Sequence, residues 1–158
     1  MTTNNSKENN ISELKALAQK LLDLMSTTSK ADVSYDEAGD CYVINIDGGN
    51  ETGLLIGKKG ETLAALQSIL GVLFKQKVGE WVRISVNVGD YLEKEESYLK
   101  NLALSAAARA KETGVAQNLY NLKPSQRRII HMILADDKSV STESVGEGEE
   151  RYLVVKSS

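Results

Sequence analysis

The segment Gly57-Lys58-Lys59-Gly60 constrains the fold of this 158-residue chain more than any other feature. It lies between the apolar run Leu54–Ile56 and a stretch with the apolar spacing of a helix, Glu61–Gln76. Glycines let the main chain approach a ligand closely, and the amides at the start of a helix attract phosphate. The segment therefore predicts a backbone clamp for nucleic acid, with Lys58 and Lys59 contacting phosphate. A simple turn between two helices is the alternative interpretation.

The residues before this loop predict one helix and a hairpin. Apolar residues recur at helical spacing from Ile11 to about Ser26. Strands are expected at Val33–Tyr35 and Cys41–Asp47, joined by a turn, and Asn50 can cap a short helix that runs into the loop. The polar residues 1–10 predict a disordered tail.

A second helix and a third strand are predicted after the loop. The alternation of apolar and polar residues from Trp81 to Val88 indicates the strand. The element order is therefore α-β-β-α-α-β, in a first domain expected to span residues 11–89. The residues expected to be buried by the helix are Leu63, Leu66, Leu70, Leu73 and Phe74.

The pattern starts again in a second predicted domain, residues 90–158. A long helix, a strand, another helix and a hairpin are expected there, so the chain as a whole is predicted to be α+β. Gly114 is the expected C-cap of the long helix. The four elements are predicted at Tyr91–Thr113, Val115–Asn118, Pro124–Ala135, and the strand pair Val140–Ser144 and Tyr152–Lys156.

Net charge and its distribution limit the class of partner. The chain carries a formal charge of −3, which argues against a general polyanion binder. Residues 58–88, however, hold five basic and two acidic side chains, so a basic zone that includes Arg83 is expected around the glycine loop. The sequence contains no run of apolar residues long enough to span a membrane and no signal peptide. The single cysteine, Cys41, predicts neither a disulfide nor a metal site, so a cytoplasmic protein is expected.

A second constellation lies in the later helix, at Arg127-Arg128-Ile129-Ile130-His131. Residues four apart on a helix lie about 40° apart, so Arg127 and His131 share a face and can reach the same phosphate. A guanidinium matches the geometry of phosphate, and a histidine can donate a hydrogen bond and stack on a base. A solvated helix face with an incidental histidine is the alternative.

The loop in its α-β-β-α-α-β context resembles a type II KH domain. The family signature is matched by Ile56, Gly57, Gly60 and Leu63. The resemblance implies that the loop holds the sugar-phosphate backbone while an apolar groove, lined by Ile56 and Leu63, accepts about four unpaired bases. Leu63 is equally well interpreted as a core residue.

The motif Pro-x-x-Arg-Arg-Ile-Ile-His, between a long helix and a terminal hairpin, resembles an R-three-H domain. KH and R-three-H domains in this order resemble the bacterial Jag, SpoIIIJ-associated or KhpB family, without the amino-terminal Jag domain common there. This resemblance implies a noncatalytic, cytoplasmic protein that binds single-stranded RNA, as an RNA chaperone or post-transcriptional regulator. It also implies a small single-KH protein as partner, and a link to cell-wall growth, cell shape and division.

Three positions depart from the family pattern. Lys123 replaces the usual Asn before the helical proline, which removes a good N-cap but adds positive charge. Tyr152 and Leu153 stand where basic residues are common. The predicted nucleic-acid-binding residues are Ile56, Gly57, Lys58, Lys59, Gly60, Leu63, Arg83, Lys123, Arg127, Arg128 and His131.

Single-stranded DNA is an alternative ligand, and neither a membrane nor a small-molecule substrate is expected. Two alternative functions remain. In the first, the KH groove binds a protein and the chain is an interaction adaptor. In the second, His131 is the general base of a phosphodiesterase, although no second histidine or carboxylate cluster accompanies it. No catalytic residue, metal or cofactor is predicted.

Overall fold

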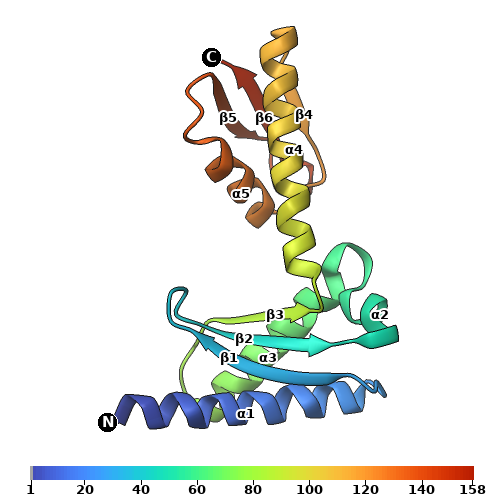
Figure 1. Ribbon diagram of the computed structural model, residues 1–158, viewed down its shortest axis with the longest axis vertical. Coiled ribbons are helices and arrows are strands. Elements are labelled where there is room, and N and C mark those ends of the chain that lie inside the picture. The colour runs from blue at the N-terminus through green and yellow to red at the C-terminus, as the bar shows by residue number, and fades with distance from the viewer. Residues whose placement is uncertain (1) are drawn as a thin grey trace. The chain divides into compact units, whose positions relative to one another are not determined.

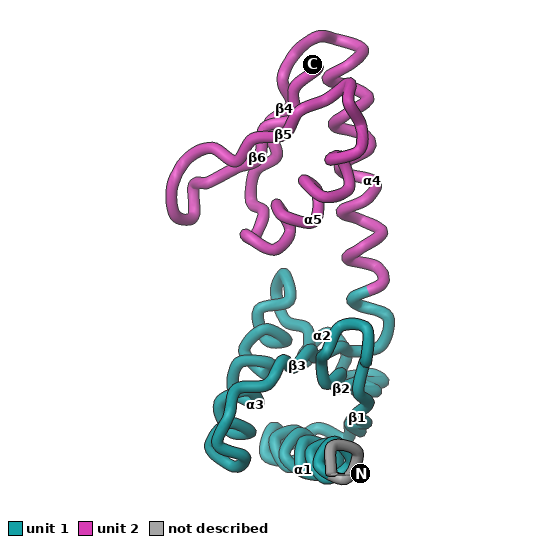
Figure 2. Tube along the Cα trace, turned by 90° about the vertical axis from the view of Figure 1, so that its left-hand side faces the viewer, with its two compact units in different colours: residues 1–92 teal, residues 93–158 magenta. Residues whose placement is uncertain are grey.

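A computed structural model describes residues 2–158, with side chains from residue 6 onward (Figure 1). The chain forms two compact units, Met1–Leu92 and Glu93–Ser158 (Figure 2), and each is described by itself below. Among the described residues, no helix has both the length and the apolar composition needed to cross a bilayer. Both units combine helices with a three-stranded sheet, which confirms the predicted α+β class.

Unit 1 has the predicted α-β-β-α-α-β order. Its sheet has the strand order β1-β2-β3, with β1 antiparallel and β3 parallel to the central strand. Apolar residues of α1 and α3 form one core with the sheet, represented by Leu14, Ile44, Phe74 and Val86. The elements are α1 (Thr2–Leu24), β1 (Lys30–Asp36), β2 (Cys41–Asp47), α2 (Thr52–Ile56), α3 (Glu61–Val78) and β3 (Ile84–Val88), with single 3₁₀ turns at Gly49–Glu51 and Lys58–Gly60.

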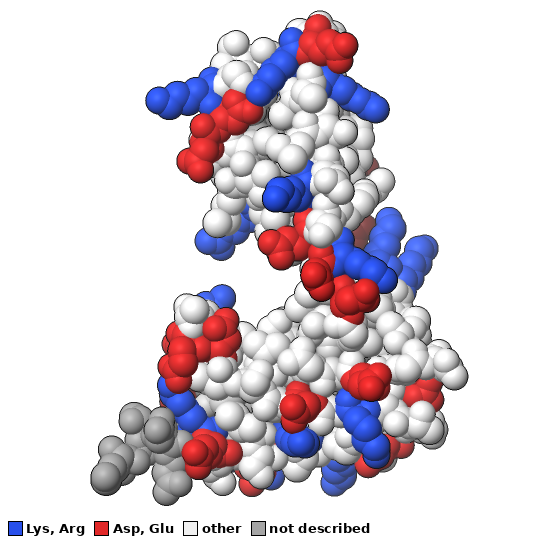
Figure 3. All heavy atoms as spheres, in the orientation of Figure 1, with Lys and Arg blue, Asp and Glu red and all other residues white. Residues whose placement is uncertain are grey.

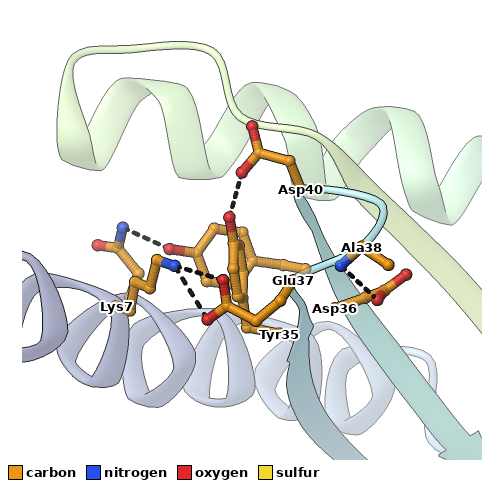
Figure 4. A network of polar contacts seen from close by, with 8 residues as sticks. Lys7, Tyr35, Asp36, Glu37, Ala38 and Asp40 are labelled. Carbon is orange, nitrogen blue, oxygen red and sulfur yellow. Dashed lines mark hydrogen bonds and ion pairs between the residues drawn. The ribbon is translucent and has the colours of Figure 1, made fainter.

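The first helix begins earlier than predicted. Residues 1–10 were expected to form a disordered tail, but α1 begins at Thr2. Contacts with the hairpin hold its first turns: Lys7 Nζ lies 3.0 Å from a Glu37 carboxylate oxygen and 4.0 Å from the centre of the Tyr35 ring (Figure 4). The Asn10 amide donates a hydrogen bond to the hydroxyl of Tyr42. These long-range contacts offset the low helix propensity of a polar segment, and local composition does not reveal them.

Two boundaries and one buried position also differ from the prediction. Asn50 lies inside a 3₁₀ turn and does not cap α2, whose N-cap is Glu51. The third strand begins at Ile84, and Trp81 is 64% exposed beneath the ammonium of Lys75. On α3 the core position is Phe74, whereas the neighbouring Leu73 is 42% exposed.

Unit 2 packs two helices against a sheet of strand order β4-β6-β5, in which both pairings are antiparallel. Small residues of α4, including Ala103 and Ala110, are fully buried and let this helix approach Ile130 of α5 and Val155 of β6 closely. Gly114 ends α4 with a φ of 68°, as expected for a C-cap. The elements are α4 (Tyr91–Thr113), β4 (Gln117–Leu119), α5 (Pro124–Leu134), β5 (Val140–Val145) and β6 (Tyr152–Ser157), with a 3₁₀ turn at Gly148–Glu150.

Paired substitutions on α3 test which residue it buries. Phe74→Ala should destabilise unit 1 by about 3–5 kcal/mol because it leaves a cavity in the core. Leu73→Ala is the matched control and should cost less than about 1 kcal/mol at its exposed site. Urea unfolding followed by circular dichroism and by the fluorescence of Trp81, the single tryptophan, reports on unit 1. An equal loss in the two variants would contradict this register.

The carboxylate of Asp137 predicts how unit 2 responds to acid. A hydrogen bond from Lys111 Nζ, 2.6 Å away, together with donors from Ser139, lowers the pKa of Asp137 to about 2. Because the folded-state pKa is depressed, this contact stabilises unit 2 above the ordinary pKa and is lost as pH falls toward 2. Asp137→Asn should therefore lower the melting temperature at pH 7, and the difference from wild type should shrink as pH falls and vanish only well below pH 2, where Asp137 is protonated in the folded state. A difference that persists there would contradict the assignment.

Candidate nucleic-acid interface

The glycine loop of unit 1 is built from three departures from ordinary backbone geometry. Gly57 has a φ of 71°, Lys59 of 52° and Gly60 of 74°, all in the region that disfavours residues with a Cβ. The amide of Gly57 closes α2 by donating to the carbonyl of Gly53, at 2.9 Å. The chain thus leaves α2 and enters α3 within a single turn.

Neighbouring atoms add a second reason for glycine at both ends of the loop. A Cβ on Gly57 would lie 2.9 Å from the amide nitrogen of Thr62. A Cβ on Gly60 would lie 2.5 Å from the hydroxyl oxygen of Tyr91. The glycines were predicted to give a ligand access to the backbone, but the loop needs them for its own geometry as well.

The loop presents positive charge next to the start of an 18-residue helix. Gly60 is the N-cap of α3 and has no side chain to bond the amides of the first turn. Lys58 and Lys59 are both exposed, and the amino end of a helix favours an anion. Glu61 brings one negative charge to the same turn. The arrangement suits a phosphate that approaches the loop from solvent.

The two apolar residues of the KH signature differ in accessibility. Leu63 is 7% exposed and belongs to the core of unit 1. Ile56 is half-buried and packs against the same core while keeping some exposed surface. Their contribution to a surface that binds bases remains a prediction, and Ile56 has more surface to offer than Leu63.

The expected basic zone around the glycine loop is wrong. Lys75 lies fifteen residues along α3 from Gly60, a distance of about 22 Å at 1.5 Å per residue, and Lys77 is paired with Glu13 of α1. Arg83 precedes β3 and donates to the carbonyl of Gly39, whereas Tyr91 beside the loop follows the other end of that strand. On the face seen in Figure 3, basic and acidic side chains are interspersed over each unit. Lys75, Lys77 and Arg83 are therefore close to the loop in sequence but not in space.

A cavity of about 420 Å³ in unit 2 brings together the second set of predicted residues. Arg127, Arg128 and His131 all line it from α5, as their spacing predicted. The hairpin formed by β5 and β6 supplies the opposite wall. The remaining lining residues are Pro124, Thr142, Ser144, Arg151 and Leu153.

Arg127 holds the ends of this site together. Its Nη1 donates to the carbonyl of Leu122, at 2.6 Å, and to the carbonyl of Arg151, at 3.3 Å. One guanidinium thus joins the segment before α5 to the start of β6. Both contacts use Nη1, and among the described residues Nε and Nη2 contact no acceptor, so these two groups can still bind a phosphate.

Hydroxyl groups of β5 orient the other polar side chains of the cavity. The Nδ1 atom of His131 contacts the hydroxyl of Thr142. The Nε atom of Arg151 donates to the hydroxyl of Ser144 at 2.8 Å. Arg151, Thr142 and Ser144 are absent from the predicted site. The period of two in the predicted hairpin could have identified them, because Thr142, Ser144 and Arg151 share the face of the buried Leu153.

Two charged features lie next to cavity residues in the sequence without lining the cavity. Lys123 is the N-cap of α5, and its backbone amide donates to the side chain of Gln126 at 2.8 Å. It precedes Pro124 but does not line the cavity itself. The exposed acids Glu147, Glu149 and Glu150 lie in the turn that leads directly into Arg151. None of the three is among the residues that line the cavity.

Comparison with known proteins agrees with this geometry. Residues 97–157, which include α5 and the hairpin, match the R-three-H domain. An RNA-binding protein KhpB from Clostridium symbiosum is 31% identical over 137 residues, covering 87% of this chain and 61% of that protein. Across both units, the chain is similar to proteins of the KhpB, or Jag, family.

Other KhpB proteins extend this similarity. RNA-binding protein KhpB of Bacillus subtilis is 32% identical over 80% of this chain and 61% of its own length. RNA-binding protein KhpB of Streptococcus pneumoniae is 31% identical over 97% of this chain and 46% of its own length. The chain thus spans between about half and three fifths of the KhpB relatives that it matches.

Two alanine substitutions test whether the glycine loop of unit 1 needs a glycine at position 57. Gly57→Ala should destabilise unit 1 by about 1–3 kcal/mol, because it places a Cβ at positive φ and against Thr62. Gly53→Ala is the control: Gly53 lies in α2, and a Cβ there meets no atom within 4 Å. It should be neutral or slightly stabilising. Equal urea midpoints for Gly57→Ala and wild type would contradict the described loop.

Proposed function

We propose that this protein binds single-stranded RNA without catalysis and contacts phosphates through each unit. The observation that carries the proposal is the unit 2 cavity, where Arg127, Arg128, Arg151 and His131 converge. Guanidinium groups match phosphate bidentately, and phosphate contacts supply most of the sequence-independent affinity for nucleic acid. The name RNA-binding protein KhpB, given to the relatives, supports the same ligand class.

Unit 1 supplies the second phosphate contact. Lys58 and Lys59 lie on a glycine-flanked turn at the amino end of α3, so charge and helix amides coincide there. Ile56 adds apolar surface beside the loop. Selection among base sequences must come from contacts other than these, because phosphate carries no sequence information.

A binding role suits the surroundings of His131 better than phosphodiester cleavage. The group that contacts its Nδ1 atom is the hydroxyl of Thr142, whereas a general base is commonly oriented by a carboxylate. The other polar groups at the cavity are guanidinium and hydroxyl groups, which bind phosphate without exchanging protons near neutral pH.

The remaining expectations from the family resemblance are proposals of the same kind. The protein is expected to act in the cytoplasm as an RNA chaperone or post-transcriptional regulator connected with cell shape and cell-wall growth. A small single-KH protein is the proposed partner. Exposed apolar residues on α3, Ile69, Val72 and Leu73, support a protein contact on unit 1.

Fluorescence anisotropy with a labelled, unstructured RNA of about 12 nucleotides tests the proposal. Each lost phosphate contact lowers the slope of log affinity against log salt by about 0.7 for a single strand. Lys58→Ala/Lys59→Ala should therefore weaken binding and flatten this slope by about 1.4. Arg128→Ala/His131→Ala should also weaken binding, and it spares Arg127, which supports the fold of the site.

Matched variants remove charge elsewhere. Lys75→Ala/Lys77→Ala removes two positive charges from the end of α3 that lies about 22 Å along the helix from Gly60, and Lys138→Ala removes one from unit 2. Both should bind like wild type within about twofold. Wild-type binding that does not change with salt, or equal losses in site and control variants, would overturn the proposal. Shortening of the RNA during the assay would favour the phosphodiesterase instead.

A further inference from the structure

Unit 2 carries a pair of tyrosines on the side of its sheet opposite the cavity. The rings of Tyr120 and Tyr152 lie 4.8 Å apart, centre to centre, at an interplanar angle of 38°. Tyr120 is 58% exposed and Tyr152 is half-buried. The pair thus presents aromatic surface to solvent instead of filling the core.

The strand register shows why these rings share a face. Leu153 and Val155 of β6 point into the core formed with α4 and α5, so Tyr152 and Val154 point to the other side. In the antiparallel register Leu119 pairs with Leu153, and one residue farther along this register Tyr120 lies beside Tyr152. Figure 2 shows the strands of unit 2 to the left of α4, with the second face of the sheet turned away from that helix.

The tyrosine pair lies at one end of this face. The Asn118 amide donates to the hydroxyl of Tyr120 at 3.2 Å and so orients that ring. Farther along the face, Lys156 pairs with Glu143 at 2.9 Å. Between the tyrosines and this ion pair, Val154 is only 6% exposed. The accessible nonpolar surface on this part of the sheet is therefore largely aromatic.

Arg127 connects the tyrosine pair to the phosphate site. One of its two acceptors, the carbonyl of Leu122, lies two residues after Tyr120, and the other belongs to Arg151, the neighbour of Tyr152. Arg151 points into the cavity while Tyr152 points to the opposite face. The phosphate site and the tyrosine pair therefore meet at the same end of the sheet, with the start of β6 between them.

We propose that Tyr120 and Tyr152 form a stacking platform for unpaired bases of an RNA strand whose phosphates are bound at the Arg127, Arg128, His131 and Arg151 cavity. The inference rests on the proposed function and adds how the bases are held. Stacking of bases on exposed aromatic rings adds affinity with little dependence on base identity. A ring already oriented by Asn118 loses little conformational freedom on binding.

An unpaired base is the occupant that this surface fits. The platform is two tyrosine rings at the end of the sheet that carries the cationic cavity on its opposite face, and a strand of RNA offers flat bases and phosphates at neighbouring positions. Because side chains alternate along a strand, Arg151 offers a cation on one side and Tyr152 offers a ring on the other. Adjacent positions at the start of β6 can therefore contact a phosphate and a base of the same strand.

Anisotropy measurements on two RNAs of equal length separate stacking from phosphate binding. One is an oligouridine of about 12 nucleotides, and the other has the same ribose-phosphate backbone with abasic sites at its central positions. Tyr120→Leu/Tyr152→Leu should weaken binding of oligouridine by about five- to a hundredfold, the range expected for one lost stacked base. The salt slope should be unchanged, because no phosphate contact is lost. The variant and wild type should bind the abasic RNA equally.

The aromatic control is Tyr120→Phe/Tyr152→Phe, which should retain oligouridine binding within about threefold because the rings remain. Circular dichroism melts establish that each variant is folded, and the single Tyr120→Leu, at the more exposed position, repeats the test if the double variant melts early. Equal binding of oligouridine by the leucine variants and wild type would overturn the platform, even if Arg128→Ala/His131→Ala still flattens the salt slope. Equal losses on both RNAs would overturn it too, by showing a structural effect. A wild type that binds neither RNA would instead remove the proposed function.

Discussion

The turn from Gly57 to Gly60, with its three positive φ angles, is the constraint on which the arrangement of unit 1 depends. It ends α2 and starts α3 within a few residues, and α3 then supplies the central side chains of the core, such as Phe74. Atoms of Thr62 and Tyr91 occupy the space that a Cβ would need at the two glycines. A loop with such fixed geometry positions its amides and lysines before any ligand arrives, which reduces the entropy lost on binding.

Arg127 has a comparable position in unit 2, but it contributes through hydrogen bonds. Its Nη1 satisfies carbonyls from two segments, and those segments carry the cavity on one side and the tyrosine pair on the other. A guanidinium has five donors, so one residue can support the fold and bind a ligand at once. Loss of RNA binding in an Arg127→Ala variant would therefore mix two causes, whereas Arg128 and His131 report on the ligand more directly.

Much of this architecture could be predicted because the decisive signals are local. Apolar periodicity predicted α4 and β2 with their correct bounds, and a spacing of about one helical turn placed Arg127 with His131. What the sequence did not reveal depends on contacts between distant segments. The contacts of Lys7 and Asn10 with the β1–β2 hairpin fix the start of α1. In unit 2, the register of the β5–β6 hairpin brings Arg151 into the cavity. The predicted basic zone was wrong for the same reason, since α3 carries Lys75 and Lys77 far from the loop.

The net charge of −3 and the position of the acids decide which forces can hold RNA here. Glu147, Glu149 and Glu150 lie in the turn that leads into Arg151, so beyond a Debye length of about 8–10 Å their charges partly offset those of the cavity arginines. Long-range attraction of a polyanion is then weak, and affinity must arise from contacts that act at short range. Guanidinium–phosphate hydrogen bonds, helix amides and stacking on tyrosine all act at short range. Such a surface favours strands whose bases are already unpaired, because a duplex offers its phosphates but not its base faces.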